Sequence, residues 1–505
     1  MQQCDAYWRM PQPQTWVMGT GLVEKTWTLD EAGRFTLRSH RNLATGYEWA
    51  QGGDLSGDEF GLTFNGAFLT GGTGGWAAVD AGSQTGPQGE LTAHITLRGH
   101  GLAVTRHYVA YPGTGVIQEW TAYVNETGVD AKVDDPMIFR QKLAQRDTAD
   151  GDFYYMTGGG NFAGSTMLKK LPMAEGLTRR FDSYTDMETC EVDGHIGYHE
   201  TLDREQGTGI WYELYALRNR AREEGVVLTF DYNGYWQAQY ACLEGGNTLY
   251  GWCHLTGYDF PAGETLTLPP AMTCVFTGDE DDMGNTLTAY EYRYKWDYTR
   301  EAYFNKSSMA IWKESPLTED VFQMVDNARY IGMERIWVDD FWFDAKGLWN
   351  GTFGDDWTAL ADYIRKNGML FRLWMPPWHA DRLSGLQVSH PEWLVGWSGW
   401  WYNWTIDLGQ EEAYQWVLDM LTRKQQEFGD YDLRVDGSSS RFRNAGSFVD
   451  AGGDYNVTFK QSENWYRLCR EFKERNPKAG LDGCSSGGCA MTIESIRYAD
   501  QQQIR

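Results

Sequence analysis

Short apolar runs that end in aspartate recur in the last third of the chain. They are residues 336–340 (Ile-Trp-Val-Asp-Asp), 433–437 (Leu-Arg-Val-Asp-Gly) and 496–500 (Ile-Arg-Tyr-Ala-Asp). Helix-length segments separate most neighbouring runs, and this alternation is typical of a βα barrel. Because such barrels carry their chemistry at the C-terminal ends of their strands, these aspartates are candidate catalytic residues.

The first 295 residues have a different pattern. Apolar and polar residues alternate over 91–97 and 102–111, and the turn residues 112–115 (Pro-Gly-Thr-Gly) precede a further strand-like run over 116–124. Alternation with a period of two predicts strands, and the turn predicts a hairpin. Many strands and few helices predict a large β-sandwich, of the supersandwich type, over residues 1–295.

Residues 296–505 predict a (β/α)8 TIM-type catalytic barrel, so the fold class is multidomain, β followed by α/β. We expect strands at 308–312, 335–343, 369–375, 432–436, 480–484 and 496–500, and helices at 318–331, 356–366, 411–428 and 459–475. A closed barrel of this class has eight strands and about 250 residues. We therefore expect the barrel to be truncated after about strand six, as a fragment or as a sheet completed by another chain.

Composition and charge narrow the function classes. Aromatic residues make up 15% of the chain, with 24 Trp, which fits either sugar-stacking surfaces or an aromatic core. The net charge is −26, from 44 basic and 70 acidic residues. Such a field repels nucleic acids and anionic membranes, so neither is expected as a partner. No apolar run approaches the roughly 18 residues of a membrane-spanning helix.

The sequence predicts no metal and no cofactor. The 8 Cys are scattered without metal-ligand spacing, and His195 and His199 lack a clear third ligand. The amino terminus has neither the basic nor the apolar segment of a signal peptide. A cytoplasmic location is expected if Met1 is the native start, and secretion stays open.

Local chemistry suggests a role for each of two residue pairs, one made of two acids and one made of an arginine and an acid. Asp339 and Asp340 end a strand, where both can turn toward the barrel mouth and accept hydrogen bonds from sugar hydroxyls. A helix cap with one solvated acid is the alternative. Arg434 and Asp436 are two residues apart and share a face. The cation would keep Asp436 ionised, as a nucleophile requires, although a purely structural ion pair is the alternative.

Asp500 is the second candidate catalytic acid, with Arg497 as its nearest basic residue. If it faced Asp436, the neighbouring charge would raise its pKa, as a general acid requires. Carboxylates roughly 5–5.5 Å apart predict a retaining glycosidase, and a wider separation predicts an inverting one.

Residues from about 300 onward resemble glycoside hydrolase family 36, the α-galactosidase and α-N-acetylgalactosaminidase family. The motifs lie in order, and they are 336–343 (its "LDDGWF" strand), 367–377 ("GMKFGLWFEPE"), 390–393, 406–408, 434–436 ("KWD") and 484–488 ("CSGGGGR"). Asp500 falls where the family's acid/base aspartate lies. The hairpin over 102–125 also resembles the family's amino-terminal sandwich.

The resemblance implies a retaining, exo-acting α-galactosidase with Asp436 as nucleophile and Asp500 as acid/base. Asp339 and Asp340 would hold sugar hydroxyls at C4 and C6. The implied substrate-binding residues also include Arg434, Trp312, Trp374, Cys484, Ser485, Gly487 and Arg497. The two tryptophans would be stacking walls, and a place in the barrel core is their alternative.

Departures from the family pattern leave the sugar open. Arg434 replaces the family's Lys, Ser438 replaces its Asn, and the glycine-rich loop continues as Cys489-Ala490. The expected partner is an α-linked galactoside or a galactosamine-type oligosaccharide. Alternatives are an α-N-acetylgalactosaminidase or α-galactosaminidase, a transglycosylase, and a non-catalytic carbohydrate-binding protein. A homo-oligomer is compatible with the sequence.

Overall fold

A computed structural model describes most of the 505 residues. The described residues are 5–50, 57–143, 148–157, 167–182, 211–243, 246–296, 306–311, 319–340, 342–351, 356–398, 403–436, 456–484 and 492–502. Their contacts divide them into two compact units, one ending at Trp296 and one comprising the described residues from Lys306 onward.

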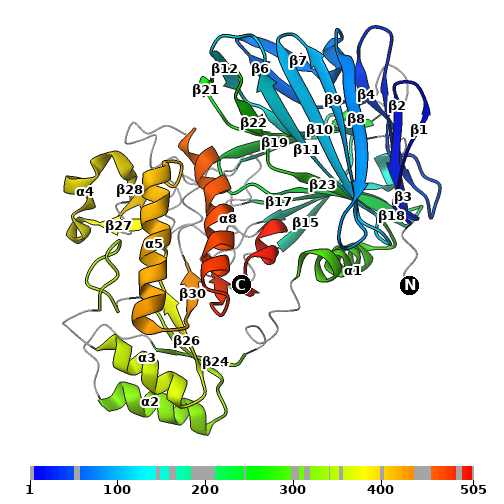
Figure 1. The fold of residues 1–505 in the computed structure, drawn as a ribbon. Coiled ribbons are helices and arrows are strands. Elements are labelled where there is room, and N and C mark those ends of the chain that lie inside the picture. The colour runs from blue at the N-terminus through cyan, green and yellow to red at the C-terminus, as the bar shows by residue number, and fades with distance from the viewer. Residues whose placement is uncertain are drawn as a thin grey trace. The chain divides into compact units, whose positions relative to one another are not determined.

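The first unit consists of four antiparallel sheets (Figure 1). The ten-stranded sheet contains, in order, β15 (Met167–Pro172), β14 (Gly151–Thr157), β17 (Trp211–Asn219), β18 (Glu224–Phe230), β23 (Ala271–Thr277), β11 (Val116–Asn125), β10 (Leu102–Ala110), β9 (Leu91–Gly99) and β8 (Ala77–Thr85), with β22 (Thr265–Thr267) paired to β11. The five-stranded sheet is β1 (Tyr7–Gln12), β2 (Thr15–Gly19), β3 (Val23–Leu29), β4 (Phe35–Asn42) and β5 (Gly57–Asp58). The two four-stranded sheets are β21 (Tyr258–Phe260), β12 (Ala131–Asp134), β6 (Gly61–Phe64) and β7 (Ala67–Thr70), and β13 (Met137–Leu143), β20 (Gly246–Cys253), β19 (Trp236–Leu243) and β16 (Thr178–Asp182).

Aromatic side chains join these sheets face to face. Trp27 of β3 packs on Tyr108 of β10 with ring centroids 4.2 Å apart. Phe153 of β14 stacks on Tyr240 of β19 at 3.8 Å. Such contacts between alternate, inward-pointing residues are the packing of a β-sandwich. The hairpin predicted over 102–124 is confirmed, because β10 and β11 pair antiparallel.

The second unit contains the βα pattern that the sequence predicts. Its six-stranded parallel sheet has the order β24 (Ser308–Ile311), β25 (Arg335–Val338), β26 (Leu370–Trp374), β30 (Asp432–Val435), β31 (Leu481–Gly483) and β32 (Gln501–Gln502). The long helices are α2 (Glu319–Tyr330), α3 (Trp357–Lys366), α5 (Glu411–Phe428) and α8 (Val457–Arg475). A small antiparallel sheet of β27 (His379–Asp381), β29 (Asn403–Ile406) and β28 (Leu394–Ser398) lies between β26 and α5 in the chain, and the sequence analysis missed it.

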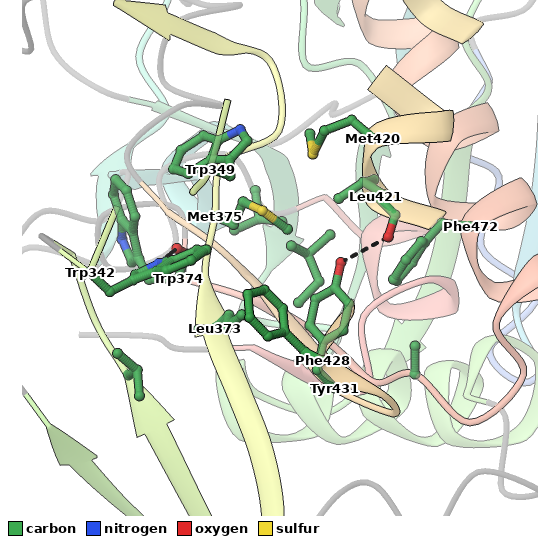
Figure 2. Close-up of a cluster of buried hydrophobic side chains, with 14 of the residues drawn as sticks. Trp342, Trp349, Leu373, Trp374, Met375, Met420, Leu421, Phe428, Tyr431 and Phe472 are labelled. Atoms are coloured by element: carbon green, nitrogen blue, oxygen red, sulfur yellow. Dashed lines mark hydrogen bonds between the residues drawn. The ribbon is translucent and has the colours of Figure 1, made fainter. Parts of the chain in front are cut away.

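The two faces of the parallel sheet differ in polarity. Alternate residues such as Val338, Leu373 and Leu433 are buried in one apolar cluster with residues of the helices, among them Leu421 and Phe472 (Figure 2). Helices α5 and α8 run side by side against this sheet (Figure 1). Because successive strand residues point to opposite faces, the intervening residues share the other face, and many of them are charged.

Charged residues on this inner face pair with one another. Arg335 on β25 binds Asp432 on β30 at 2.8 Å, and Arg372 on β26 donates to Asp482 on β31 at 2.9 Å. Arg372 also lies 3.5 Å from Asp432, so it joins the two carboxylates. A buried charge is tolerated only with such a partner.

Three expectations need correction or stay open. The strand expected over 335–343 ends at Val338, and the one expected over 496–500 is a 3₁₀ helix (Glu494–Arg497) followed by β32. No closed barrel is seen among the described residues, and truncation after strand six stays an expectation. None of the described helices is long and apolar enough to cross a membrane.

One buried histidine makes the sandwich sensitive to acid. His40 on β4 is fully buried opposite Lys25 on β3, and neither ring nitrogen has a hydrogen-bond partner among the described residues. Burial, followed by the nearby Lys25 charge, holds the pKa of His40 well below its usual value. The folded state therefore keeps His40 neutral while the unfolded chain binds a proton.

We expect the free energy of unfolding to be full above pH about 6.5 and to fall below it, by about 1.4 kcal/mol per pH unit for this one group. His40→Leu should remove that part of the slope in urea unfolding followed between pH 7.5 and 5. Leu37, buried on the same strand, gives the control, since Leu37→Ala lowers the stability without changing an ionisable group and should keep the wild-type slope. An unchanged slope in His40→Leu would contradict the assignment.

Candidate active site

Asp436 lies at the carboxyl end of β30 and is only partly buried. The indole Nε1 of Trp374, the last residue of β26, donates a hydrogen bond to its Oδ2 at 3.1 Å. Trp374 is itself held by Trp342, whose Nε1 donates to its carbonyl oxygen at 2.8 Å (Figure 2). The structure thus presents an accessible carboxylate with one oxygen fixed by a buried donor, which suits a nucleophile.

Arg434 lies under this carboxylate on the same face of β30. Its guanidinium carbon lies 3.7 Å from the centre of the Trp337 ring, and its Nη1 donates to Oδ2 of Asp482. Its Nε is 3.9 Å from Oδ2 of Asp339. Burial acts to lower the pKa of Arg434, but the carboxylates of Asp482 and Asp436 outweigh it, so the pKa is raised and the cation is permanent.

Asp339 and Asp340 follow β25, on the strand between β24 and β26. Asp339 is 2% exposed and Asp340 is half-buried. The backbone N–H of Asp340 donates to Oδ1 of Asp339 at 2.8 Å. Burial raises the pKa of Asp339 to about 6, and Asp436 and Asp340 act in the same direction against the Asp340 N–H and Arg434. Because the charge of Asp436 acts on the pKa of Asp339, the two residues belong to one electrostatic site.

Trp374 and Cys484 are both buried parts of this site. Trp374 is 1% exposed, and Phe343 stacks on its ring with centroids 5.8 Å apart, so the ring is core rather than the expected stacking wall. Cys484 follows β31, and its N–H donates to the carbonyl of Val435 beside Asp436. Three further predicted substrate-binding residues, Trp312, Ser485 and Gly487, lie outside the described residues.

Asp500 does not face Asp436, which corrects the predicted catalytic pair. Its backbone and its carboxylate bond the backbone of Leu481, the first residue of β31, and its carboxylate also pairs with Lys473 at 3.1 Å. Asp436, in contrast, follows Val435, which lies opposite Gly483 at the other end of β31.

Asp500 and Asp436 are therefore three residues apart along the strand direction and two strands apart across the sheet. At ~3.3 Å per residue and ~4.8 Å per strand, their backbones lie roughly 14 Å apart. Carboxyl pairs of glycosidases lie within about 9.5 Å of each other. The carboxylate of Asp500 is fixed at the amino end of the sheet, so it acts there as a structural link between β31 and α8. Arg497 is exposed in the 3₁₀ helix that precedes it and is not brought to Asp436 by the described contacts.

Asp482 is the site residue that the sequence analysis missed. It is fully buried in the middle of β31 and receives hydrogen bonds from Arg372 and Arg434. Its signal was an acid inside the short apolar run 481–484, two residues before Cys484. Among the described residues, no group of three or more His, Cys, Asp or Glu is arranged to hold a metal ion.

Comparison with known proteins supports the same family. Residues 315–504 match the Melibiase family model. The α-galactosidase of Escherichia coli is 24% identical over 197 residues, which are 35% of this chain and 26% of that protein. The aligned segment thus spans about a quarter of the length of this curated relative.

Solved structures show the likeness of fold over nearly the whole chain. The family 36 α-galactosidase AgaB from Geobacillus stearothermophilus superposes with a TM-score of 0.77 at 16% identity, covering 99% of this chain and 75% of that one. A variant of AgaA from the same organism, solved with raffinose, gives a TM-score of 0.72 at 16% identity, with 97% and 75% covered. The family model and the curated relatives confirm the resemblance to glycoside hydrolase family 36, and the solved structures show the shared fold.

The raised pKa of Asp339 leads to a test of stability. Its folded pKa of about 6 lies above the unfolded value, so ionisation on going from pH about 4 to about 6 costs the fold stability. Asp339→Asn keeps the oxygen that accepts from Asp340 and removes the charge. We expect this variant to unfold at higher free energy than wild type at pH 7, by on the order of 2 kcal/mol, and to match it near pH 4.

Denaturant unfolding at both pH values measures the difference. Asp381→Asn at the half-buried capping position before residues 382–384 serves as a control that should show no such gain. Equal stability of Asp339→Asn and wild type at pH 7 would mean that Asp339 is not strained by ionisation.

Proposed function

We propose that this chain, whose residues 315–504 match the Melibiase family model, is a retaining, exo-acting α-glycosidase that hydrolyses terminal α-galactosidic linkages. The observation that carries the proposal is the accessible carboxylate of Asp436, held by Trp374 at the carboxyl end of a parallel βα sheet. Arg434 lies beneath it, and the Asp339–Asp340 pair lies in the same electrostatic site.

In this proposal Asp436 attacks the anomeric carbon and the glycosidic C–O bond breaks, while a second carboxylic acid protonates the departing oxygen. The same group then takes the proton of the water that hydrolyses the covalent glycosyl ester. The N–H of Trp374 donates to Oδ2 and so fixes the orientation of the attacking carboxylate. Asp339 and Asp340 accept hydrogen bonds from sugar hydroxyls, which are donors of the kind that buried carboxylates need. Asp500 has no part in the reaction, because its carboxylate is bound at the opposite end of the sheet.

The substrate follows from the relatives. AgaA was solved with raffinose, and a further AgaA structure holds stachyose. An α-linked galactoside oligosaccharide is therefore the proposed substrate. The 2-amino and 2-acetamido galactosides remain the second candidate, since Arg434 replaces the Lys of the family pattern directly beneath the nucleophile.

Assays on nitrophenyl glycosides test the proposal. Wild type should release nitrophenol from the α-galactoside, and NMR should show the α-anomer as the first product. Asp436→Asn should lower kcat by at least about 10⁴-fold, because the amide cannot form the ester. A fluorinated galactosyl donor should leave an adduct on the peptide that contains Asp436.

The same assay distinguishes the alternatives. A preference for the 2-amino or 2-acetamido analogue would move the assignment to that sugar class. Transfer to excess acceptor sugar would indicate a transglycosylase. Binding of galactosides without turnover, retained in Asp436→Ala, would indicate a non-catalytic carbohydrate-binding protein and would reject the proposal.

The hydrogen bond from Trp374 gives a further prediction. Trp374→Phe removes the donor and should lower kcat/KM by about 10–100-fold, the range for a bond to a charged group. Trp357→Phe is the matched control, because Trp357 is 3% exposed in α3 and its Nε1 has no hydrogen-bond partner among the described residues. The unfolding temperature should fall in both variants, whereas kcat/KM should fall only in Trp374→Phe. Equal kcat/KM in the two variants would remove Trp374 from the site.

A further inference from the structure

Asp482 joins two cations through a single oxygen. Its Oδ2 accepts from Nη1 of Arg372 at 2.9 Å and from Nη1 of Arg434. Its Oδ1 is buried and has no hydrogen-bond partner among the described residues. A fully buried carboxylate that concentrates its bonds on one oxygen holds both guanidinium groups in one geometry.

Arg434 is thereby fixed from three directions. The Trp337 ring supports its guanidinium face at 3.7 Å, Asp482 binds its Nη1, and its Nε lies 3.9 Å from Asp339. A planar guanidinium stacked on a ring can move only within its plane. The length of the Asp482 side chain therefore decides how far the cation extends along that plane.

We propose that Asp482 is a positioning residue for Arg434. It holds the guanidinium so that the positive charge of Arg434 lies between Asp339, the proposed sugar-binding carboxylate, and Asp436, the proposed nucleophile. This inference rests on the proposed function and deepens it. Arg434 and Asp482 lie opposite each other on β30 and β31, so the combined length of the two side chains fixes where Nη1 meets Oδ2. A Lys paired with a Glu would keep the same combined length, because Lys is shorter than Arg and Glu is longer than Asp.

A double-mutant cycle tests the matched lengths. Arg434→Lys shortens the combined length of the two side chains, and Asp482→Glu lengthens it. Each single variant should therefore displace the cation and lower kcat/KM for nitrophenyl α-galactoside by about 10–100-fold. The double variant restores the combined length and should recover to within about 10-fold of wild type. Losses in the double variant that equal the product of the two single losses would overturn the proposal.

Asp432 provides the control for a merely structural role. It is also a buried inner-face carboxylate near Arg372, but its other partner is Arg335 at the amino end of the sheet. Asp482→Asn and Asp432→Asn should both lower the unfolding temperature. Only Asp482→Asn should change the acid limb of the pH profile of kcat/KM, because only Asp482 contacts Arg434. A change of equal size in Asp432→Asn would show that the effect is general destabilisation.

Crystal structures of substrate-free wild type and Asp482→Asn would show the position of Arg434 directly. The guanidinium of Arg434 should leave its place over Trp337 in the variant, and an unmoved Arg434 would overturn the proposal. If wild type hydrolyses no α-galactoside, the proposed function fails, and the position of Arg434 in these two structures still decides whether Asp482 holds it.

Discussion

Pairing of buried charges on the inner face of the parallel sheet is the constraint on which the second unit depends. Moving ions out of water costs several kcal/mol each, and only close partners offset that cost. Arg372 meets this requirement by lying between Asp432 and Asp482, and Arg335 and Arg434 complete the two ends of the series. Register and charge therefore agree for two pairs on adjacent strands, since Arg372 lies opposite Asp432 and Arg434 lies opposite Asp482. A slip of one residue would turn every charge into the apolar cluster.

The same ladder gives the sheet a chemical direction. At its amino end the buried carboxylates of Asp432 and Asp500 are held in ion pairs with Arg335 and Lys473. Its carboxyl end is open, and there Asp436 is partly exposed while Arg434 is stacked and bound below it. Asp339 bears the cost of this arrangement, because burial next to other acids raises its pKa. Instability concentrated at one end of a sheet is expected where binding takes place.

The abundant aromatic residues are used mainly for packing in the described part of the chain. Trp342, Trp349, Trp374 and Trp378 are all nearly inaccessible in the second unit, as Figure 2 shows for three of them. Of these, Trp374 also contacts the candidate nucleophile Asp436, through its N–H rather than through its ring face. The composition alone left sugar stacking and core packing equally open, and burial favours the core for these residues.

The sequence by itself predicted most of the elements and pointed to Asp436 as the candidate nucleophile. A period of two predicted the hairpin of β10 and β11, helical periodicity predicted α2, α3, α5 and α8, and the order of motifs gave the resemblance to glycoside hydrolase family 36. These are local properties, because each depends on residues close together in the chain. Tertiary structure alone decided which acids meet. Asp436 and Asp500 both end an apolar run, yet one follows its strand and the other precedes it, so they lie at opposite ends of the sheet. Asp482 became visible as the partner of Arg434 for the same reason, since strand register joins residues 48 positions apart that no local pattern connects.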